Sequence, residues 1–260
     1  MSEKSSQELS AVAVYCGSNL GNDRTYAEAA AVLGRTMAKR GIRLVYGGGQ
    51  VGLMGVVADA ALESGGEVLG VITEALVAKE VSHRGLARLQ VVGTMHERKA
   101  AMADAADAFV MLPGGFGTLD EFFEVVTWTQ LGIHAKPCGV LDAAGFFEPL
   151  RALVDGAVTA GFVHPAHRDM IVADDNPGRL LDQLAAWTPV TVSKWLDPAE
   201  RRSESVPGPQ RAADGCVRWD NWAFPLTRGY CLSGRQVPGS VVCQSRLFPG
   251  PRRYRRLSRT

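Results

Sequence analysis

Short apolar runs alternate with segments of helical periodicity along the chain as far as residue 186. The runs are apolar at nearly every position, which is typical of parallel strands that helices cover on both faces. The alternation predicts an α/β fold with a doubly wound, Rossmann-like, mostly parallel sheet in a single domain. The expected strands are residues 12–15, 42–46, 68–72, 89–92, 108–112, 136–141 and 168–172, and the expected helices are residues 26–40, 53–63, 96–104, 122–132, 146–160 and 177–186.

A glycine-rich segment at residues 113–121, PGGFGTLDE, follows one of these runs and precedes an apolar helical pattern. Such a strand, turn and helix start present free backbone N–H groups and the positive end of a helix dipole, so anions bind well there, phosphate above all. Gly114, Gly115 and Gly117 allow the backbone to approach a ligand closely and to adopt positive φ angles. The segment predicts a phosphate site.

Glu121 needs a further explanation, because a carboxylate beside a phosphate is electrostatically unfavourable. Thr118-x-x-Glu121 fits a capping box, in which Thr118 caps the helix and Glu121 reaches back to the backbone of Thr118. Alternatively, Glu121 is a general base or a charge stabiliser beside a bound phosphate ester. The pattern alone does not separate the two interpretations.

Several motifs closely resemble those of the LOG (Lonely Guy) family of cytokinin riboside 5′-monophosphate phosphoribohydrolases. The resemblance extends over residues 11–186, and two ordered motifs with the strand between them make it specific. The matching segments are residues 15–18 (YCGS), 46–49 (YGGG), 52–55 (GLMG), 95–100 (MHERKA), 113–121 and 127–132 (TWTQLG).

This resemblance implies hydrolysis of the N-glycosidic bond of an N6-modified, for example prenylated, adenosine 5′-monophosphate, which yields the free base and ribose 5-phosphate. Glu121 and Arg98 would be the catalytic residues, with no cofactor and no metal. The family also implies a homodimer with shared active sites. The implied substrate-binding residues are Ser18, Gly48, Glu80, Lys99, Gly114, Gly115, Gly117, Thr118 and Thr127.

Three other functions are open to comparison with this one. Many family members carried an older label of lysine decarboxylase, but that chemistry normally needs a pyridoxal phosphate lysine, and none of the six Lys has a recognisable setting for it. A dinucleotide site at Gly47 is disfavoured because its GxGxxG follows the second expected strand instead of the first. A nucleotide- or cofactor-binding carrier without catalysis is the alternative, and Arg98 together with Glu121 favours the enzyme.

Four polar or reactive side chains outside the glycine-rich segment carry expectations of their own. Arg98 and Lys99 fall in the first turn of an expected helix, where basic residues oppose the dipole, so an anion is expected as a third partner. His83 falls in a long connection at residues 73–87, and we expect it to be a solvated loop residue. Cys16 is expected to be a small buried hydrophobe.

The organisation along the chain predicts an N-terminal extension at residues 1–10, the catalytic domain at 11–197 and an Arg- and Pro-rich tail at 198–260. From Glu200 onward there are twelve Arg, no Lys and four acidic residues, so the tail is basic and the domain before it acidic. The tail is either a disordered polyanion- or membrane-binding segment or an unselected sequence, such as the product of a shifted reading frame. We favour the second interpretation and expect low order beyond residue 197.

Location and partners follow from what is absent. No run of about 18 apolar residues is present, and residues 1–10 lack the apolar region of a secretory signal. We therefore expect cytoplasmic residence, a small nucleotide as the ligand, and neither a nucleic acid nor a membrane as a partner.

Overall fold

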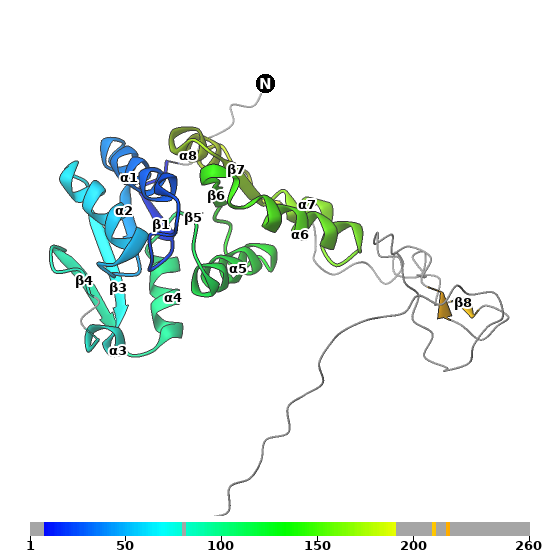
Figure 1. The fold of residues 1–260 in the computed structure, drawn as a ribbon, viewed down its shortest axis with the longest axis horizontal. Coiled ribbons are helices and arrows are strands. Elements are labelled where there is room, and N and C mark those ends of the chain that lie inside the picture. Colours follow the sequence, from blue (N-terminus) through cyan, green and yellow to red (C-terminus); the bar gives the residue numbers. More distant parts are fainter. Residues whose placement is uncertain (1–7, 80–81, 191–209, 212–216, 219–260) are drawn as a thin grey trace, which may run out of the picture. The chain divides into compact units, whose positions relative to one another are not determined.

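The computed structural model describes residues 8–79, 82–190, 210–211 and 217–218, and the chain divides into two compact units, Met1–Leu196 and Asp197–Thr260. The first unit is built on a seven-stranded sheet with the order β4-β3-β2-β1-β5-β6-β7, in which every neighbouring pair is parallel. This confirms the predicted doubly wound architecture (Figure 1). The strands are β1 Ala11–Tyr15, β2 Arg43–Tyr46, β3 Val68–Thr73, β4 Arg88–Val92, β5 Ala108–Met111, β6 Cys138–Leu141 and β7 Ile171–Asp174.

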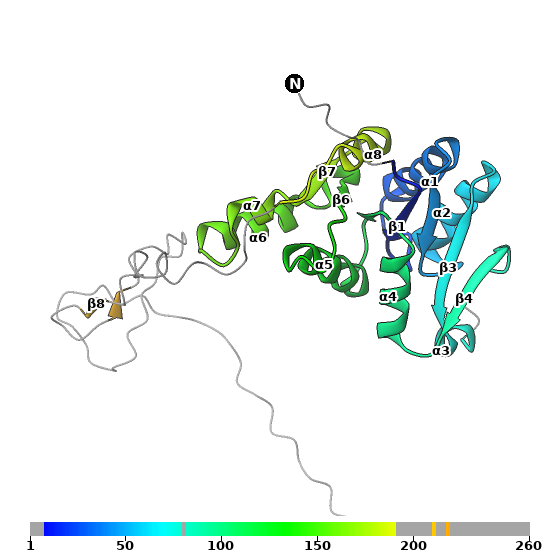
Figure 2. The ribbon, with the colours of Figure 1, turned by 180° about the vertical axis from the view of Figure 1, so that it is seen from behind.

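Helices cover both faces of this sheet, as Figures 1 and 2 show from opposite sides. The core on one face includes buried residues of α1, α2 and α8, and the core on the other face includes buried residues of α4 and α5. The helices are α1 Arg24–Lys39, α2 Gly52–Glu63, α3 Glu74–Val77, α4 Met95–Asp104, α5 Phe116–Gln130, α6 Glu148–Thr159, α7 Pro165–Arg168 and α8 Pro177–Ala185.

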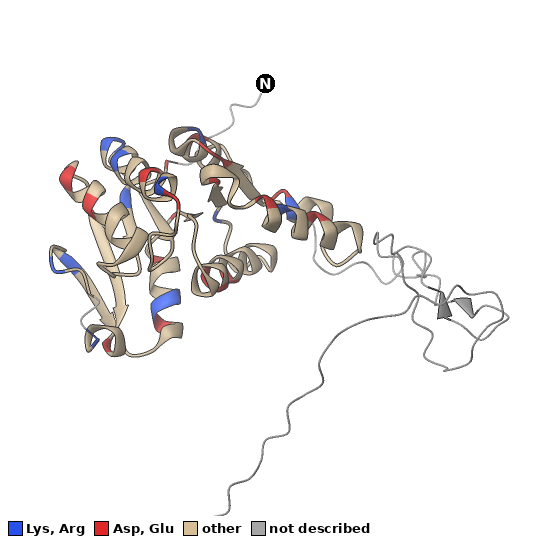
Figure 3. Cartoon of the chain, viewed as in Figure 1, with Lys and Arg blue, Asp and Glu red and all other residues tan. Residues whose placement is uncertain are grey.

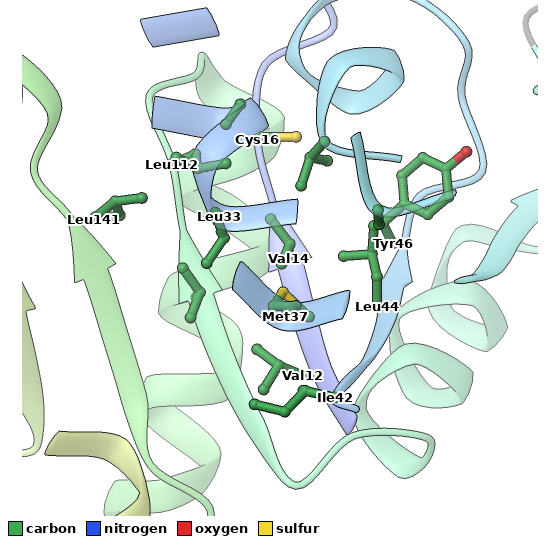
Figure 4. Packing of buried hydrophobic residues seen from close by; sticks show 14 of the residues in the cluster. Val12, Val14, Cys16, Leu33, Met37, Ile42, Leu44, Tyr46, Leu112 and Leu141 are labelled. Carbon is green, nitrogen blue, oxygen red and sulfur yellow. The ribbon is translucent and has the colours of Figure 1, made fainter. Parts of the chain in front are cut away.

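The packing of α1 on β1 illustrates how the sequence pattern makes the core. Leu33 and Met37 lie one turn apart on α1 and face Val12 and Val14, which point to the same side of β1 (Figure 4). All four side chains are fully buried or nearly so. Burial of each such side chain contributes roughly 1.5–3 kcal/mol to folding. The strands thereby hold their carboxyl ends in fixed positions.

The chain leaves the central strand β1 first to one side, through β2, β3 and β4, and then returns to pair β5 with β1. The connections after β1 and after β5 therefore diverge at the same edge of the sheet. Ligands of open α/β sheets bind at this type of topological switch point, outside the carboxyl ends of the strands.

Several expected elements have other bounds in the structure. The predicted helix at 122–132 begins six residues earlier, at Phe116. The predicted helix at 146–160 begins only at Glu148, after a 3-10 turn in which Ala144 has a φ of 54°. The predicted strand at 168–172 begins at Ile171, because Pro165 opens the short helix α7 that extends to Arg168. The long connection at 73–87 contains the helix α3.

The second unit has two described strands, β8 Gln210–Arg211 and β9 Val217–Arg218, which pair antiparallel. The expectations for the rest of the 198–260 tail, and for residues 1–7 of the N-terminal extension, lie outside the described residues. Within the described residues, no helix has both the length and the apolar composition needed to cross a lipid bilayer.

Candidate active site

Three glycine-rich turns interlock at the switch point. The N–H of Gly17 donates to the carbonyl of Pro113 at 3.0 Å, and the N–H of Leu53 donates to the carbonyl of Gly17 at 3.0 Å. A Cβ at Gly17 would lie 3.3 Å from the Cα of Gly114, a tighter contact than most side chains make, so glycine favours the close approach of the first and third turns. The turns enclose a pocket of about 800 Å³.

The third turn leaves the N-terminus of α5 open to this pocket. Helix α5 begins at Phe116 with Gly115 as the N-cap, and no described side chain caps it. Its first intrahelical hydrogen bond is donated by Leu119, so the helix offers no acceptor to the amides of residues 116–118. A Cβ at Gly115 or Gly117 would meet no described atom within 4 Å, which leaves space beside these amides.

The glycines of this turn either allow close packing of the backbone or leave open space beside it, and none of them adopts a left-handed conformation. Gly114, Gly115 and Gly117 are absent from the positive-φ residues of the described chain, so the expectation of positive φ angles here was wrong. A Cβ at Gly114 would overlap the side chain of Thr118 and approach the N of Gly17 at 2.9 Å. The turn is therefore compact at Gly114 and accessible at Gly115 and Gly117.

Glu121 points to α4 and does not cap its own helix. Its Oε1 accepts a hydrogen bond of 2.5 Å from Nη1 of Arg98, and the two side chains are only 12% and 8% exposed. Of the two interpretations left open for Glu121, the capping box does not hold, because the N-cap of α5 is Gly115, three residues before Thr118. The buried ion pair instead joins α5 to α4 at the floor of the pocket.

The guanidinium of Arg98 is held by further contacts. Its Nε donates to the carbonyl of Val71 at 3.0 Å, and its Nη1 lies 3.4 Å from Sδ of Met95. A Cβ at Gly47 would overlap its Nη2, so the second glycine-rich turn leaves room for this side chain. Removing one partner of a buried pair leaves an uncompensated charge, so Arg98 and Glu121 depend on each other.

Lys99 forms a second, less buried link between the same helices. Its Nζ lies 2.7 Å from Oδ2 of Asp120 and 3.4 Å from Oε2 of Glu124. Burial alone would lower the pKa of Lys99, but the hydrogen bond to Asp120 and the charge of Glu124 outweigh it and raise that pKa. The basic band on α4 in Figure 3 thus has carboxylate partners on α5, and no bound anion is needed to explain it.

Two buried side chains beside the pair are poor nucleophiles. Burial raises the pKa of the Tyr15 phenol, and the nearby charge of Glu121 raises it further. Burial also raises the pKa of the Cys16 thiol well above its ordinary value, and Glu121 acts in the same direction. Since the thiolate is the reactive form, Cys16 is the small buried residue that the sequence predicted.

Most of the predicted site residues line one pocket. They are Ser18, Arg98, Lys99, Gly114, Gly115, Gly117, Thr118 and Glu121. Two predicted binding residues are not part of the described lining: Gly48 has a φ of 71° and turns its carbonyl to the N–H of His83, and Thr127 donates its hydroxyl to the carbonyl of Phe123. Thr127 lies six residues beyond Glu121, about 9 Å along the helix. Glu80 lies outside the described residues.

Other pocket residues could not be identified from the sequence. Apolar side chains of separate elements, such as Ile72, Leu76 and Met95, line the pocket on the β3 and α4 side, and the edge-to-face pair Tyr26–Phe146 lines it elsewhere. No motif marks them, because ordinary core-type residues acquire this role only when the fold brings them together. Among the described residues, no group of His, Cys, Asp and Glu is arranged to hold a metal ion.

The arrangement combines an anion site with a buried carboxylate. Free amides at the N-terminus of α5 can hold a phosphate, and Glu121 lies one helical turn further along the same helix. Arg98 fixes the direction of the Glu121 side chain through their hydrogen bond. A positioned carboxylate of this kind can stabilise positive charge on a ligand or accept a proton from water.

Known proteins with similar sequences or folds were compared with the chain. Residues 54–184 match the family described as "Possible lysine decarboxylase". A probable cytokinin riboside 5′-monophosphate phosphoribohydrolase of Oryza sativa subsp. japonica is 49% identical over 179 residues, which cover 69% of this chain and 79% of the relative. A cytokinin riboside 5′-monophosphate phosphoribohydrolase of Arabidopsis thaliana is 43% identical over 214 residues, which cover 81% of this chain and 98% of the relative.

Solved structures resemble the chain in fold. The molybdenum cofactor carrier protein of Chlamydomonas reinhardtii superposes with a TM-score of 0.53 and 20% identity, covering 69% of this chain and 100% of the carrier. At this identity the likeness concerns the fold alone.

Proposed function

The chain belongs to the LOG family of cytokinin riboside 5′-monophosphate phosphoribohydrolases, and we propose that it hydrolyses the N-glycosidic bond of an N6-modified adenosine 5′-monophosphate. It is a hydrolase, and its products are the free base and ribose 5-phosphate. The observation that carries this proposal is the buried Arg98–Glu121 pair beside the open N-terminus of α5.

The reaction needs a negative group close to the ribose. As the C1′–N9 bond breaks, its electron pair leaves with the base, and positive charge develops on the ribose ring in an oxocarbenium-like state. Glu121 stabilises that charge and orients a water molecule, whose oxygen bonds to C1′ while its proton passes to the carboxylate. The departing base takes up one proton, and Glu121 gives up the proton that it received from water, so the carboxylate is regenerated. Arg98 holds Glu121 in place throughout.

The 5′-phosphate binds at the start of α5. The amides of residues 116–118, the space beside Gly115 and Gly117, and the hydroxyl of Thr118 supply donors and room for its oxygens. The positive charge of Lys99 lies in the same pocket. A phosphate held at one end of the ribose fixes the distance between C1′ and Glu121, so binding energy contributes to positioning.

The base lies against the apolar side of the pocket. Ile72, Leu76 and Met95 provide a wall without charge, next to the Arg98–Glu121 pair. Such a wall suits a purine that carries a hydrocarbon group on N6, because burial of that group is favourable. This preference is tested by comparing adenosine monophosphate with its prenylated form.

The decisive test is an assay of the purified full-length chain with isopentenyladenosine monophosphate. We expect free base and ribose 5-phosphate in equal amounts, and Glu121→Gln, which keeps the side-chain shape and removes its charge, should abolish turnover. The matched control is Asp155→Asn, an exposed carboxylate of α6 that is not part of the described pocket lining. Tight nucleotide binding without release of base would instead favour the carrier alternative.

We also propose that the protein forms a homodimer with shared active sites. Large apolar side chains are left in solvent by the single chain, including Phe116 at 94%, Phe162 at 86% and Leu153 at 68% exposure. Phe116 lines the pocket itself, and within the described chain α6 buries none of its residues. Light scattering should give twice the chain mass, and a monomer with full activity would overturn this proposal.

Two further proposals concern the bounds of the catalytic domain and the location of the protein in the cell. We propose that the catalytic domain runs from residue 11 to 197 and that the protein works in the cytoplasm. A chain trimmed after Asp197 should keep full activity, and loss of activity on trimming would assign a role to the tail. Cell fractionation followed by the same hydrolysis assay should recover the activity in the cytoplasmic fraction.

A further inference from the structure

His83 is buried, contrary to the solvated loop position that the sequence suggested. Its side chain is 5% exposed, its Nε2 lies 2.9 Å from Oδ1 of Asp59 on α2, and its Nδ1 accepts a hydrogen bond of 3.1 Å from the N–H of Gly85. Because a backbone N–H can only donate, Nδ1 carries no proton. With Nδ1 as the acceptor, Nε2 is the donor to the carboxylate of Asp59.

The segment around His83 is tied to the second glycine-rich turn. The N–H of His83 donates to the carbonyl of Gly48 at 2.9 Å, and Ser82 forms an isolated antiparallel bridge with Gly49. Asp59 belongs to the helix that begins at Gly52, directly after this turn. The side chain of His83 thus links residues 82–83 to α2. The second glycine-rich turn is bonded to residues 82–83 on one side and leads into α2 on the other, so it is held between them.

The second glycine-rich turn packs against one side of the Arg98 guanidinium. A Cβ at Gly47 would overlap Nη2 of Arg98, so the guanidinium packs directly on the backbone of Gly47. On its other sides Arg98 is bonded to the carbonyl of Val71 and to Glu121. A shift of the turn therefore moves or releases Arg98, and with it the carboxylate that Arg98 directs.

We propose that His83 is a positioning residue, which acts with Asp59 through the turn at Gly47 to hold Arg98 against Glu121. The inference rests on the proposed hydrolysis, because its consequence is read in turnover. His83 does not line the described pocket and touches no reacting atom in this account. Its effect should fall on kcat, since the phosphate site at the start of α5 belongs to another turn.

The test compares paired variants of the full chain. His83→Ala and Asp59→Ala each remove the link, whereas Asp59→Asn keeps an acceptor oxygen and His83→Gln keeps an N–H donor with the reach of Nε2. We expect kcat to fall about tenfold in both alanine variants with KM changed less than about twofold, a size typical of small misplacements of catalytic groups. The double alanine variant should be no slower than either single variant.

The conservative and control variants separate positioning from a general loss of structure. Asp59→Asn and His83→Gln should keep kcat within about threefold of the parent chain. Glu63→Ala removes an exposed carboxylate one turn further along α2 and should leave kcat unchanged. Because Asp59 is 57% exposed, its variants should fold even where those of the buried His83 do not.

Three outcomes decide between the possibilities. A folded Asp59→Ala chain with the parent's kcat, or one that differs only in melting temperature, would overturn the positioning role. Additive losses in the double variant would also overturn it, because they would show that the two side chains act separately. Failure of the parent chain to release base would defeat the proposed hydrolysis itself, which the variants alone would not do.

Discussion

The consecutive helices α4 and α5 carry the same Thr-x-x-Glu spacing near their first turns, and they use it differently. In α4, the hydroxyl of Thr94 accepts from the N–H of Glu97, and the carboxylate of Glu97 accepts from the N–H of Thr94 at 3.0 Å, which is a complete capping box. In α5, Thr118 and Glu121 make no such exchange, because Gly115 already starts the helix.

The difference arises from the residues before each threonine. Gly93 and Thr94 bring α4 to its start at Met95, with both ends of the motif engaged by the helix itself. The Gly114–Gly115 turn starts α5 three residues before Thr118 can act as a cap. The helix amides of α5 therefore remain available to a ligand, and Glu121 is free to pair with Arg98. The same spacing caps the first helix, and in our proposal it serves the ligand in the second.

The largest expected contrast is between the two glutamates. Glu121→Gln should lower kcat by about 10²- to 10⁴-fold, the range for loss of a general acid–base group. It should also lower the free energy of unfolding, because the buried guanidinium of Arg98 loses its charged partner. Glu97→Ala should leave kcat unchanged and lower the free energy of unfolding by about 1 kcal/mol, as loss of a cap does. Steady-state assays and urea unfolding measure the two quantities. If both variants lost only stability, Glu121 would be a second structural residue.

The second prediction concerns the contribution of Arg98 to the free energy of unfolding. Arg98→Met leaves the buried carboxylate of Glu121 without its partner, so we expect the free energy of unfolding to fall by about 3–5 kcal/mol. Adding Glu121→Leu should restore much of that loss, since a pair of apolar side chains has no buried charge to desolvate. Urea unfolding of the single and double variants measures this recovery. An Arg98→Met chain as stable as the parent would show that the pair is well solvated.

The two threonines should differ in a smaller way. Thr118→Val removes a phosphate ligand in our account, so KM should rise about tenfold, as expected for one hydrogen bond to a charged group. Thr94→Val removes a cap, so the free energy of unfolding should fall by about 1 kcal/mol at unchanged KM. A Thr118→Val chain with the parent's KM for the nucleotide would remove Thr118 from the phosphate site.

Lys99 should give the smallest effect, because it joins the two helices independently of their caps. Its pKa is raised in the folded chain, so its stabilising contribution is complete below the ordinary lysine pKa, about 10.4, and is lost as the pH rises through the higher folded pKa. Lys99→Met should therefore be less stable than the parent by under about 1 kcal/mol at neutral pH. That gap should close once the pH exceeds the raised pKa of Lys99 in the folded chain. A gap that widened with pH would contradict the sign of this shift.

The sequence predicted the layers of the fold better than the contacts of the site. Continuous apolar runs such as the one that became β5 identify buried parallel strands, since local composition is enough to define them. The role of Glu121 depends on where α5 begins. Because the N-cap of α5 lies three residues before Thr118, the capping-box interpretation does not hold. Helix ends are decided by a few local hydrogen bonds that a pattern does not fix.

His83 shows a second limit. Its partner Asp59 lies 24 residues away, and a histidine among polar loop residues gives no sign that it will be buried against a helix. Arg98 and Glu121 are 23 residues apart, and only the family resemblance indicated that they act together. Apolar pocket residues such as Leu76 look like any core residue until the fold places them.

The empty surroundings of Gly117 have a consequence for anyone who screens variants of this chain. A methyl group added there meets no described atom within 4 Å, so a thermal melt of Gly117→Ala would report a healthy protein. The same methyl group would occupy room reserved for an oxygen of the incoming nucleotide. In our account, a glycine such as Gly117 serves ligand binding and not folding. A screen that measures the melting temperature alone would accept its substitution without detecting the loss of binding.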